Sequence, residues 1–235
     1  MTEQLRAPPL PTQLAVGEIE AFCLQHGMWP LLGADEVGRG PLAGPVVAAA
    51  VVLSDAAARD GDGLAGLNDS KKLTAAAREA LVPAIQAVAL GWAIEAADVA
   101  EIAEFNILGA SLRAMARAAQ RAVAQVRDRG HPVPVLWLID GNQRLRDPLA
   151  GSQLTVVQGD GRSRAIAAAS VLAKVWRDNH MEQLDRQYPG YGLAGHKGYP
   201  TPEHLAALQR LGPTPQHRIG YGPVALAARQ LGLFA

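Results

Sequence analysis

Residues 29–53 read WPLLGADEVGRGPLAGPVVAAAVVL, and this stretch predicts how the fold begins. The apolar run over residues 29–34 ends at Asp35 and Glu36, as expected for a first strand. A glycine-rich turn follows, and the valine pairs of residues 44–53 favour a second strand. Because the link between the two is short, we expect them to run antiparallel.

The rest of the chain alternates between strand-like and helix-like segments. Residues 88–96 alternate as a third strand would, and the apolar run over 133–139 is typical of a buried parallel strand. A fifth strand is expected over 154–157, and residues 54–73 read as a loop. Helices are expected over residues 74–87 (with Thr74 as N-cap), 98–129, 162–187, 202–211 and 223–231. This order predicts an α/β fold, with a mixed five-stranded sheet flanked by helices.

The chain shows no internal repeat and no convincing linker. We expect three segments. Residues 1–14 are proline-rich and expected to be flexible, residues 15–200 form the main domain, and residues 201–235 form a helical extension packed on it. With 235 residues, of which 49% are hydrophobic, the chain can build one sizeable core.

Composition says more about the cellular compartment of the protein than about its binding partner. The 22 basic and 22 acidic residues give a formal net charge of zero, which does not by itself indicate a nucleic-acid-binding protein. Basic residues are, however, concentrated over residues 162–218. No apolar run is long enough to span a bilayer, and the N-terminus lacks a secretory layout. Cys23 is the only cysteine, which excludes an intramolecular disulfide and fits a reducing cytoplasm; we interpret it as a packing residue.

Carboxylates follow three separate apolar runs: Asp35 with Glu36, then Asp140, then Asp160. A single acid after a strand is more often a turn or cap residue. Recurrence at three strand ends instead favours convergence at one edge of the sheet, where the acids would repel one another unless a cation lay between them. Oxygen ligands without His or Cys favour Mg²⁺ or Mn²⁺.

The turn Gly38-Arg39-Gly40 would let backbone atoms approach a ligand closely, although a plain tight turn fits these three residues equally well. No GxGxxG or GxxxxGK[ST] pattern follows a strand, which disfavours a nucleotide-binding metabolic enzyme.

Five blocks of the chain, in the same order, resemble bacterial ribonuclease HII. They cover about residues 30–225, and the order makes the likeness far more specific than any one block. The blocks are DEVGRGPLAGPV at 35–46, NDSKKL at 68–73, LIDGN at 138–142, GD at 159–160 with AAASVLAKV at 167–175 and RD at 177–178, and HKGYPT at 196–201 with HR at 217–218 and PV at 223–224.

The resemblance implies a ribonuclease H-like fold and a two-metal endonuclease. Such an enzyme hydrolyses the RNA strand of RNA/DNA hybrids and nicks 5′ to single ribonucleotides in duplex DNA, leaving 5′-phosphate and 3′-hydroxyl ends. Asp35, Glu36, Asp140 and Asp160 match the four acidic positions, which implies that they are both the catalytic residues and the ligands of Mg²⁺ or Mn²⁺.

The resemblance also assigns substrate contacts. Gly38, Arg39 and Gly40 would read the ribose 2′-hydroxyl through backbone groups, and Tyr199 would stack on the sugar. Lys71 and Lys174 are the better candidates for phosphate contacts, ahead of Lys72 and Lys197, and solvated surface lysines are the alternative. The implied partners are hybrids and ribonucleotide-containing DNA duplexes, with no membrane, and the implied state is a monomer.

The chain departs from the resemblance at two places. Gln158 stands where a lysine is common before Gly-Asp, and Ile219-Gly220-Tyr221 replaces the usual Arg-Ser-Phe. Asp178 could support the acidic site or form a helix salt bridge. The alternatives are a type HIII ribonuclease or a junction resolvase, and, from another class, a hybrid-binding or metal-stabilised protein without catalysis.

Overall fold

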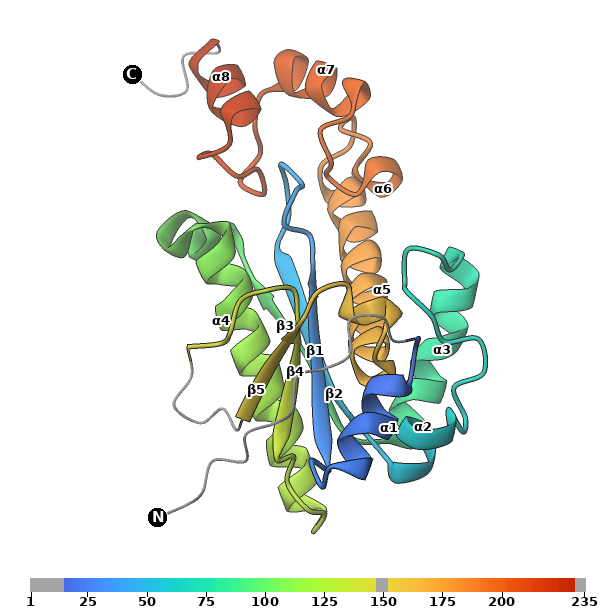
Figure 1. Cartoon of the computed structure of the whole chain (residues 1–235). Helices are drawn as coiled ribbons and strands as arrows, with labels where there is room; N and C mark the ends of the chain where they lie inside the picture. The colour runs from blue at the N-terminus through green and yellow to red at the C-terminus, as the bar shows by residue number, and fades with distance from the viewer. Residues whose placement is uncertain (1–14, 147–151, 231–235) are drawn as a thin grey trace.

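The computed structural model describes residues 15–146 and 152–230, and a single twisted sheet organises them (Figure 1). Its strands lie in the order β3-β2-β1-β4-β5. The pairs β1–β2 and β2–β3 are antiparallel, whereas β1–β4 and β4–β5 are parallel. The strands are β1 (Leu31–Val37), β2 (Val46–Leu53), β3 (Ala89–Ala97), β4 (Leu136–Asp140) and β5 (Ser152–Val156). The predicted mixed five-stranded sheet is therefore confirmed.

Long helices cover both faces of the sheet. Helix α4 (Val99–Asp128) packs on one face, and α5 (Arg164–Gln187) lies on the other, together with α1 (Glu18–Gln25), α2 (Asp55–Asp60) and α3 (Ala75–Val88) (Figure 1). Strand β2 separates the two cores, because alternate residues of its valine- and alanine-rich sequence enter each. This burial on both faces explains why β2 lacks polar residues.

Close packing between α5 and the sheet depends on a glycine in β1. A Cβ atom at Gly33 would collide with the backbone of Ala165 and Ile166 in the first turn of α5. The missing side chain lets the N-terminal part of α5 lie directly against the strand that carries Asp35.

The helix predictions hold to within two residues at each end, and Thr74 does cap α3, since its Oγ1 accepts a hydrogen bond of 3.2 Å from the Ala77 amide. The loop expected over 54–73 is wrong for residues 55–60, which form α2 behind a Ser54 N-cap. Helices α1 and α6 (Leu193–His196) also had no prediction. These three helices have four to eight residues, too few for a periodic pattern.

The C-terminal helices α7 (Pro202–Leu211) and α8 (Gly222–Gln230) stand beyond the end of β1 and the turn that follows it (Figure 1). Leu42 of that turn packs with Leu208 of α7 and Val224 of α8 in a small apolar cluster. The proposed flexible segment, residues 1–14, lies outside the described residues.

Cys23 is free and buried in the core next to α5, and burial raises the pKa of its thiol to about 12. That pKa agrees with a packing residue and not a nucleophile. Within the described ranges, no helix has the length and apolar character needed to cross a bilayer.

Candidate active site

The four predicted carboxylates lie at one edge of the sheet. Asp35 and Glu36 belong to the end of β1, and Asp140 is the last residue of the parallel neighbour β4. The strands pair at Ala34 and Ile139, so Asp35 and Asp140 each come one residue after this pair. Asp160 lies in a 3-10 turn, η1 (Gly159–Gly161), that follows β5.

A hydrogen bond ties two of these strand ends together. The Gly159 amide donates to Oδ1 of Asp140 at 2.7 Å, so the turn that carries Asp160 is held against the end of β4. A Cβ atom at Gly159 would lie 3.0 Å from the same oxygen. The glycine of the Gly-Asp pair therefore gives the Asp140 carboxylate room to accept this bond.

The electrostatics of the cluster are unfavourable. Asp35 is 5% exposed and Asp160 4%. Burial raises the pKa of Asp35 well above its usual range, and the charges of Asp140, Glu36 and Asp160 raise it further. Burial also raises the pKa values of Glu36 and Asp140. Carboxylates that raise one another's pKa are close in space, and a bound cation would relieve their repulsion.

The chemistry of the donor set fits a hard divalent cation, because all four groups offer oxygen. Each carboxylate is, however, turned toward a protein partner. Oδ1 of Asp35 accepts from the Glu36 amide at 2.7 Å, Glu36 pairs with Arg39 at 3.3 Å, and Asp160 pairs with Lys71 at 3.2 Å. With the side chains so turned, no three His, Cys, Asp or Glu residues in the described part of the chain are arranged to hold an ion.

The glycine-rich turn after β1 lies beside this cluster and next to Tyr199. Gly38 has a φ of +94°, which a residue with a side chain rarely adopts, and a Cβ atom there would collide with the side chain of Arg177. A Cβ atom at Gly40 would lie 3.3 Å from Cε1 of Tyr199. The fold therefore brings together two parts of the predicted substrate-reading set that are 159 residues apart in the chain.

Two buried arginines hold this turn by donating hydrogen bonds to its backbone carbonyls. The sequence had suggested a role for neither of them. Arg218 donates to the carbonyl oxygens of Gly38 (2.7 Å), Arg39 (3.0 Å) and Gly44 (2.9 Å). Arg177 donates to the carbonyls of Pro45 (3.1 Å), Ala43 (3.2 Å) and Lys197 (3.0 Å). We call Arg177 and Arg218 the arginine brace. Their only signal in the sequence was membership of the Arg-Asp and His-Arg pairs.

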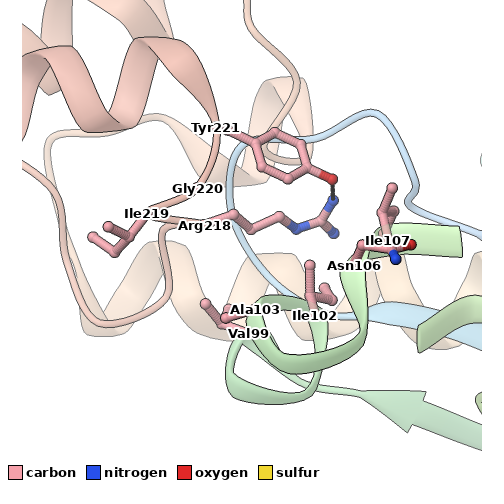
Figure 2. A pocket seen from close by; sticks show the side chains of 9 residues that line it. All are labelled: Val99, Ile102, Ala103, Asn106, Ile107, Arg218, Ile219, Gly220 and Tyr221. Atoms are coloured by element: carbon pink, nitrogen blue, oxygen red, sulfur yellow. Dashed lines mark hydrogen bonds between the residues drawn. The ribbon is translucent and has the colours of Figure 1, made fainter. Parts of the chain in front are cut away.

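Tyr221, one of the residues that departs from the family pattern, extends the brace (Figure 2). Its hydroxyl lies 3.2 Å from Nη1 of Arg218 and 3.2 Å from the Arg39 carbonyl oxygen. Arg218 and Tyr221 border a cavity of about 260 Å³ against the first turns of α4. The described residues that line this cavity include no carboxylate, so it is distinct from the candidate metal centre.

The two favoured lysines lie in different surroundings. Lys71 is exposed and reaches Asp160, so it lies at the carboxylate cluster. Lys174 instead pairs with Asp178 one helical turn along α5 at 2.7 Å. Asp178 also lies 3.6 Å from Arg78, so it forms ion pairs with residues of α5 and α3.

Comparison with known proteins gives the same fold. The ribonuclease H2 of Pyrococcus horikoshii OT3 superposes with a TM-score of 0.67 at 23% identity, over 86% of this chain and 98% of that one. The ribonuclease HII of Archaeoglobus fulgidus, solved in a complex with PCNA, gives 0.59 at 24% identity, over 77% and 86%. Bst-RNase HIII, solved with Mn²⁺, gives 0.62 at 21% identity, over 88% and 71%.

These similarities show that the chain has the ribonuclease H-like fold. The sequence itself matches the family described as Ribonuclease HII over residues 32–222, a range that contains all four carboxylates, the glycine-rich turn and the arginine brace. The chain therefore belongs to the ribonuclease HII family.

Proposed function

We propose that this ribonuclease H endonuclease is a metal-dependent enzyme of the HII type, which cleaves hybrids and also nicks duplex DNA at single ribonucleotides. The observation that carries the proposal is the position of the carboxylate cluster beside a glycine turn that touches Tyr199. The cluster supplies the site of chemistry, and the turn supplies a surface that can distinguish ribose from deoxyribose.

Asp35, Glu36, Asp140 and Asp160 would hold Mg²⁺ or Mn²⁺, in line with the Mn²⁺ complex of the HIII neighbour. Two such ions, when bound, supply a water of lowered pKa and stabilise the leaving 3′-oxygen. Asp35 is the buried carboxylate at the inner side of the site, and the Gly159 amide orients Asp140. Hydrolysis leaves a 5′-phosphate and a 3′-hydroxyl.

Substrate choice would depend on the turn. Gly40 leaves no side chain between the backbone and a sugar beside Tyr199, while the missing side chain of Gly38 makes room for Arg177, and Arg218 bonds the Gly38 carbonyl. Tyr199 is 42% exposed, so its ring is free to stack on a ribose beside the turn. The 2′-hydroxyl is the group that such a site can use to tell RNA from DNA. Lys71, which pairs with Asp160, would contact a phosphate near the cluster. Lys174 is the weaker candidate for such a contact, because it pairs with Asp178 instead of with a carboxylate of the cluster.

The HII type is favoured over the HIII type by the family match, although HIII enzymes are among the structural neighbours. A bacterial HII enzyme acting as a monomer on hybrids and ribonucleotide-containing duplexes, with no membrane partner, completes the proposal. A free, buried Cys23 fits a cytoplasmic location.

The decisive test uses a labelled DNA duplex with one ribonucleotide and, in parallel, a long RNA/DNA hybrid, each with Mg²⁺, Mn²⁺ or chelator. We expect a metal-dependent nick 5′ to the ribonucleotide and cleavage of the hybrid. Cleavage of the hybrid alone would favour the HIII type.

The variant Asp140→Asn separates an enzyme from a hybrid-binding protein without catalysis. We expect cleavage to be lost while binding of the hybrid stays near normal. Unchanged cleavage by this variant would exclude the proposed site.

A further inference from the structure

A second groove lies along the first half of helix α4. It has a volume of about 440 Å³ and runs between helix α4 and the loop that follows β4. Its charged lining residues are Arg113, Arg144 and Arg146, and the described residues that line it include no aspartate or glutamate. We call it the arginine groove.

The described part of the loop that forms one wall is anchored by a single residue, Leu145. Leu145 is 4% exposed and packs in the core beneath α4. Its amide donates to Oε1 of Gln153 at 2.8 Å, and its carbonyl accepts from Nε2 of Gln153 at 2.9 Å. Because Leu145 is fixed in this way, its neighbours Arg144 and Arg146 are held at the surface, where both are exposed.

The facing wall is the irregular start of α4. Asn106 has φ 56° and ψ 170°, which interrupts the helix, and its Oδ1 accepts from the amides of Leu108 and Gly109. Beyond this break, Arg113 lies over the ring of Phe105, 3.9 Å from the ring centroid. Its Nε is 3.7 Å from Glu101, a longer ion pair that leaves the Arg113 side chain 56% exposed.

One wall of the arginine groove is connected in the chain to the carboxylate cluster. The loop that carries Arg144 and Arg146 begins directly after Asp140, and the irregular start of α4 lies near the same end of the sheet (Figure 1). A duplex that crosses the cluster carries a phosphate charge for about every 1.7 Å of its axis, so its flank brings phosphates past the cluster.

We propose that the arginine groove binds the phosphodiester backbone of the nucleic-acid substrate beyond the scissile position. The proposal rests on the function proposed above and extends it, since it names a contact that neither the carboxylates nor the glycine-rich turn provides. Arginine suits this role because its planar fork can bond two phosphate oxygens at once. Such contacts fix the register of the duplex without reading its sequence.

The test measures how hybrid affinity depends on salt. The double substitution Arg144→Gln and Arg146→Gln is made in the Asp140→Asn background, so that a labelled RNA/DNA hybrid stays intact in Mg²⁺. We expect the slope of log K against log salt concentration to fall by about 2, and Kd to rise about tenfold at moderate salt. Arg59→Gln with Arg127→Gln is the matched control, because both residues are exposed and lie at the opposite end of the sheet.

Three outcomes are informative. A reduced slope for the groove pair, with the slope of the control pair unchanged, supports the proposal. An unchanged slope for the groove pair, or equal losses for both pairs, overturns it, provided that thermal unfolding shows the variants to be folded. If the protein without substitutions neither binds nor cleaves hybrid, the function proposed above fails, and that result is distinct from failure of the groove alone.

Discussion

Asp35 and Glu36 of the carboxylate cluster directly precede the glycine-rich turn in the chain, but the protein stabilises the cluster and the turn in opposite ways. Burial and mutual repulsion raise the pKa of Asp35, so the cluster is electrostatically strained within the protein. The carbonyls of the turn are instead satisfied by the arginine brace. The reactive groups are therefore left in need of an external cation, while the groups that position the substrate are completed by the protein itself.

The largest expected effect comes from the cluster. Asp35→Asn removes a buried negative charge at the centre of the proposed metal site, so we expect Mg²⁺-dependent cleavage to fall about ten-thousandfold, or about 5 kcal/mol in the activation barrier. In chelator the same variant should unfold at a higher denaturant concentration, because a repelling charge is gone. Paired cleavage assays and urea titrations would show this. Lower stability in chelator would contradict the strain that we assign to the cluster.

The brace should respond in the opposite way. Arg218→Met keeps most of the apolar stem but leaves the carbonyls of Gly38 and Gly44 buried without their donor. We expect the free energy of unfolding to fall by about 4 kcal/mol. Arg129→Met is the control, because Arg129 also donates to carbonyl oxygens but at the surface, and it should cost less than about 1 kcal/mol. If urea titrations showed equal losses in the free energy of unfolding for the two variants, Arg218 would contribute no more to stability than a surface arginine.

The next effect depends on pH and involves His217, whose backbone pairs with Ala43 of the turn. Burial, and secondarily the neighbouring His204, lower the pKa of His217 to about 4. Its Nδ1 accepts from the Thr214 amide, and its Nε2 lies 3.0 Å from Nε2 of His204. The Nδ1 of His204 contacts the Tyr199 carbonyl, so that nitrogen is the donor and both rings fit a neutral, hydrogen-bonded chain.

The direction in which stability changes with pH follows from the lowered pKa of His217. Between pH 6.5 and about 4 the unfolded chain binds a proton at His217 that the folded chain does not, so stability falls as the pH falls. From pH 7 to pH 5 the loss should be about 2 kcal/mol. The carboxylate cluster has the opposite sign, because its raised pKa values favour proton uptake by the folded state. In urea titrations without metal, His217→Gln should therefore flatten the acid loss and Asp35→Asn should steepen it; the reverse order would refute both assignments.

The sequence predicted the carboxylate side of this comparison much better than the brace. Strand ends can be read from apolar runs, so Asp35, Asp140 and Asp160 could be placed at one edge before the structure was known. The brace depends on Arg177 of α5 and on Arg218, each more than 130 residues from the turn that it contacts. No local periodicity reports which carbonyl a distant guanidinium will reach, and buried arginines are exceptions to the usual pattern of burial.

Short or irregular elements were missed for a related reason. The break of α4 at Asn106 is held by the side chain of that residue, which accepts from the amides of Leu108 and Gly109, within a segment whose apolar spacing predicts an uninterrupted helix. The arginine groove, which depends on this break and on the anchored Leu145, was therefore not accessible from the pattern alone.

The smallest expected effect concerns Tyr221, where the chain departs from the family pattern. Its hydroxyl approaches both Arg218 and the Arg39 carbonyl, so it joins the brace to the turn through one additional polar group. Tyr221→Phe removes that hydroxyl and keeps the aromatic ring. The ring packs both against the core under α4 and against the small apolar cluster that contains Val224 of α8. We expect a loss of about 1 kcal/mol in the free energy of unfolding, the usual net value of one hydrogen bond.

Because Arg218 retains its bonds to Gly38 and Gly44 in this variant, the turn should keep its conformation and the nick at a single ribonucleotide should keep its position. The measurement is a urea titration of Tyr221→Phe, of Arg218→Met and of the double variant. The two side chains share a contact, so the double variant should lose less than the sum of the single losses. Strict additivity would show that the Tyr221 hydroxyl acts independently of Arg218 and is not part of the brace.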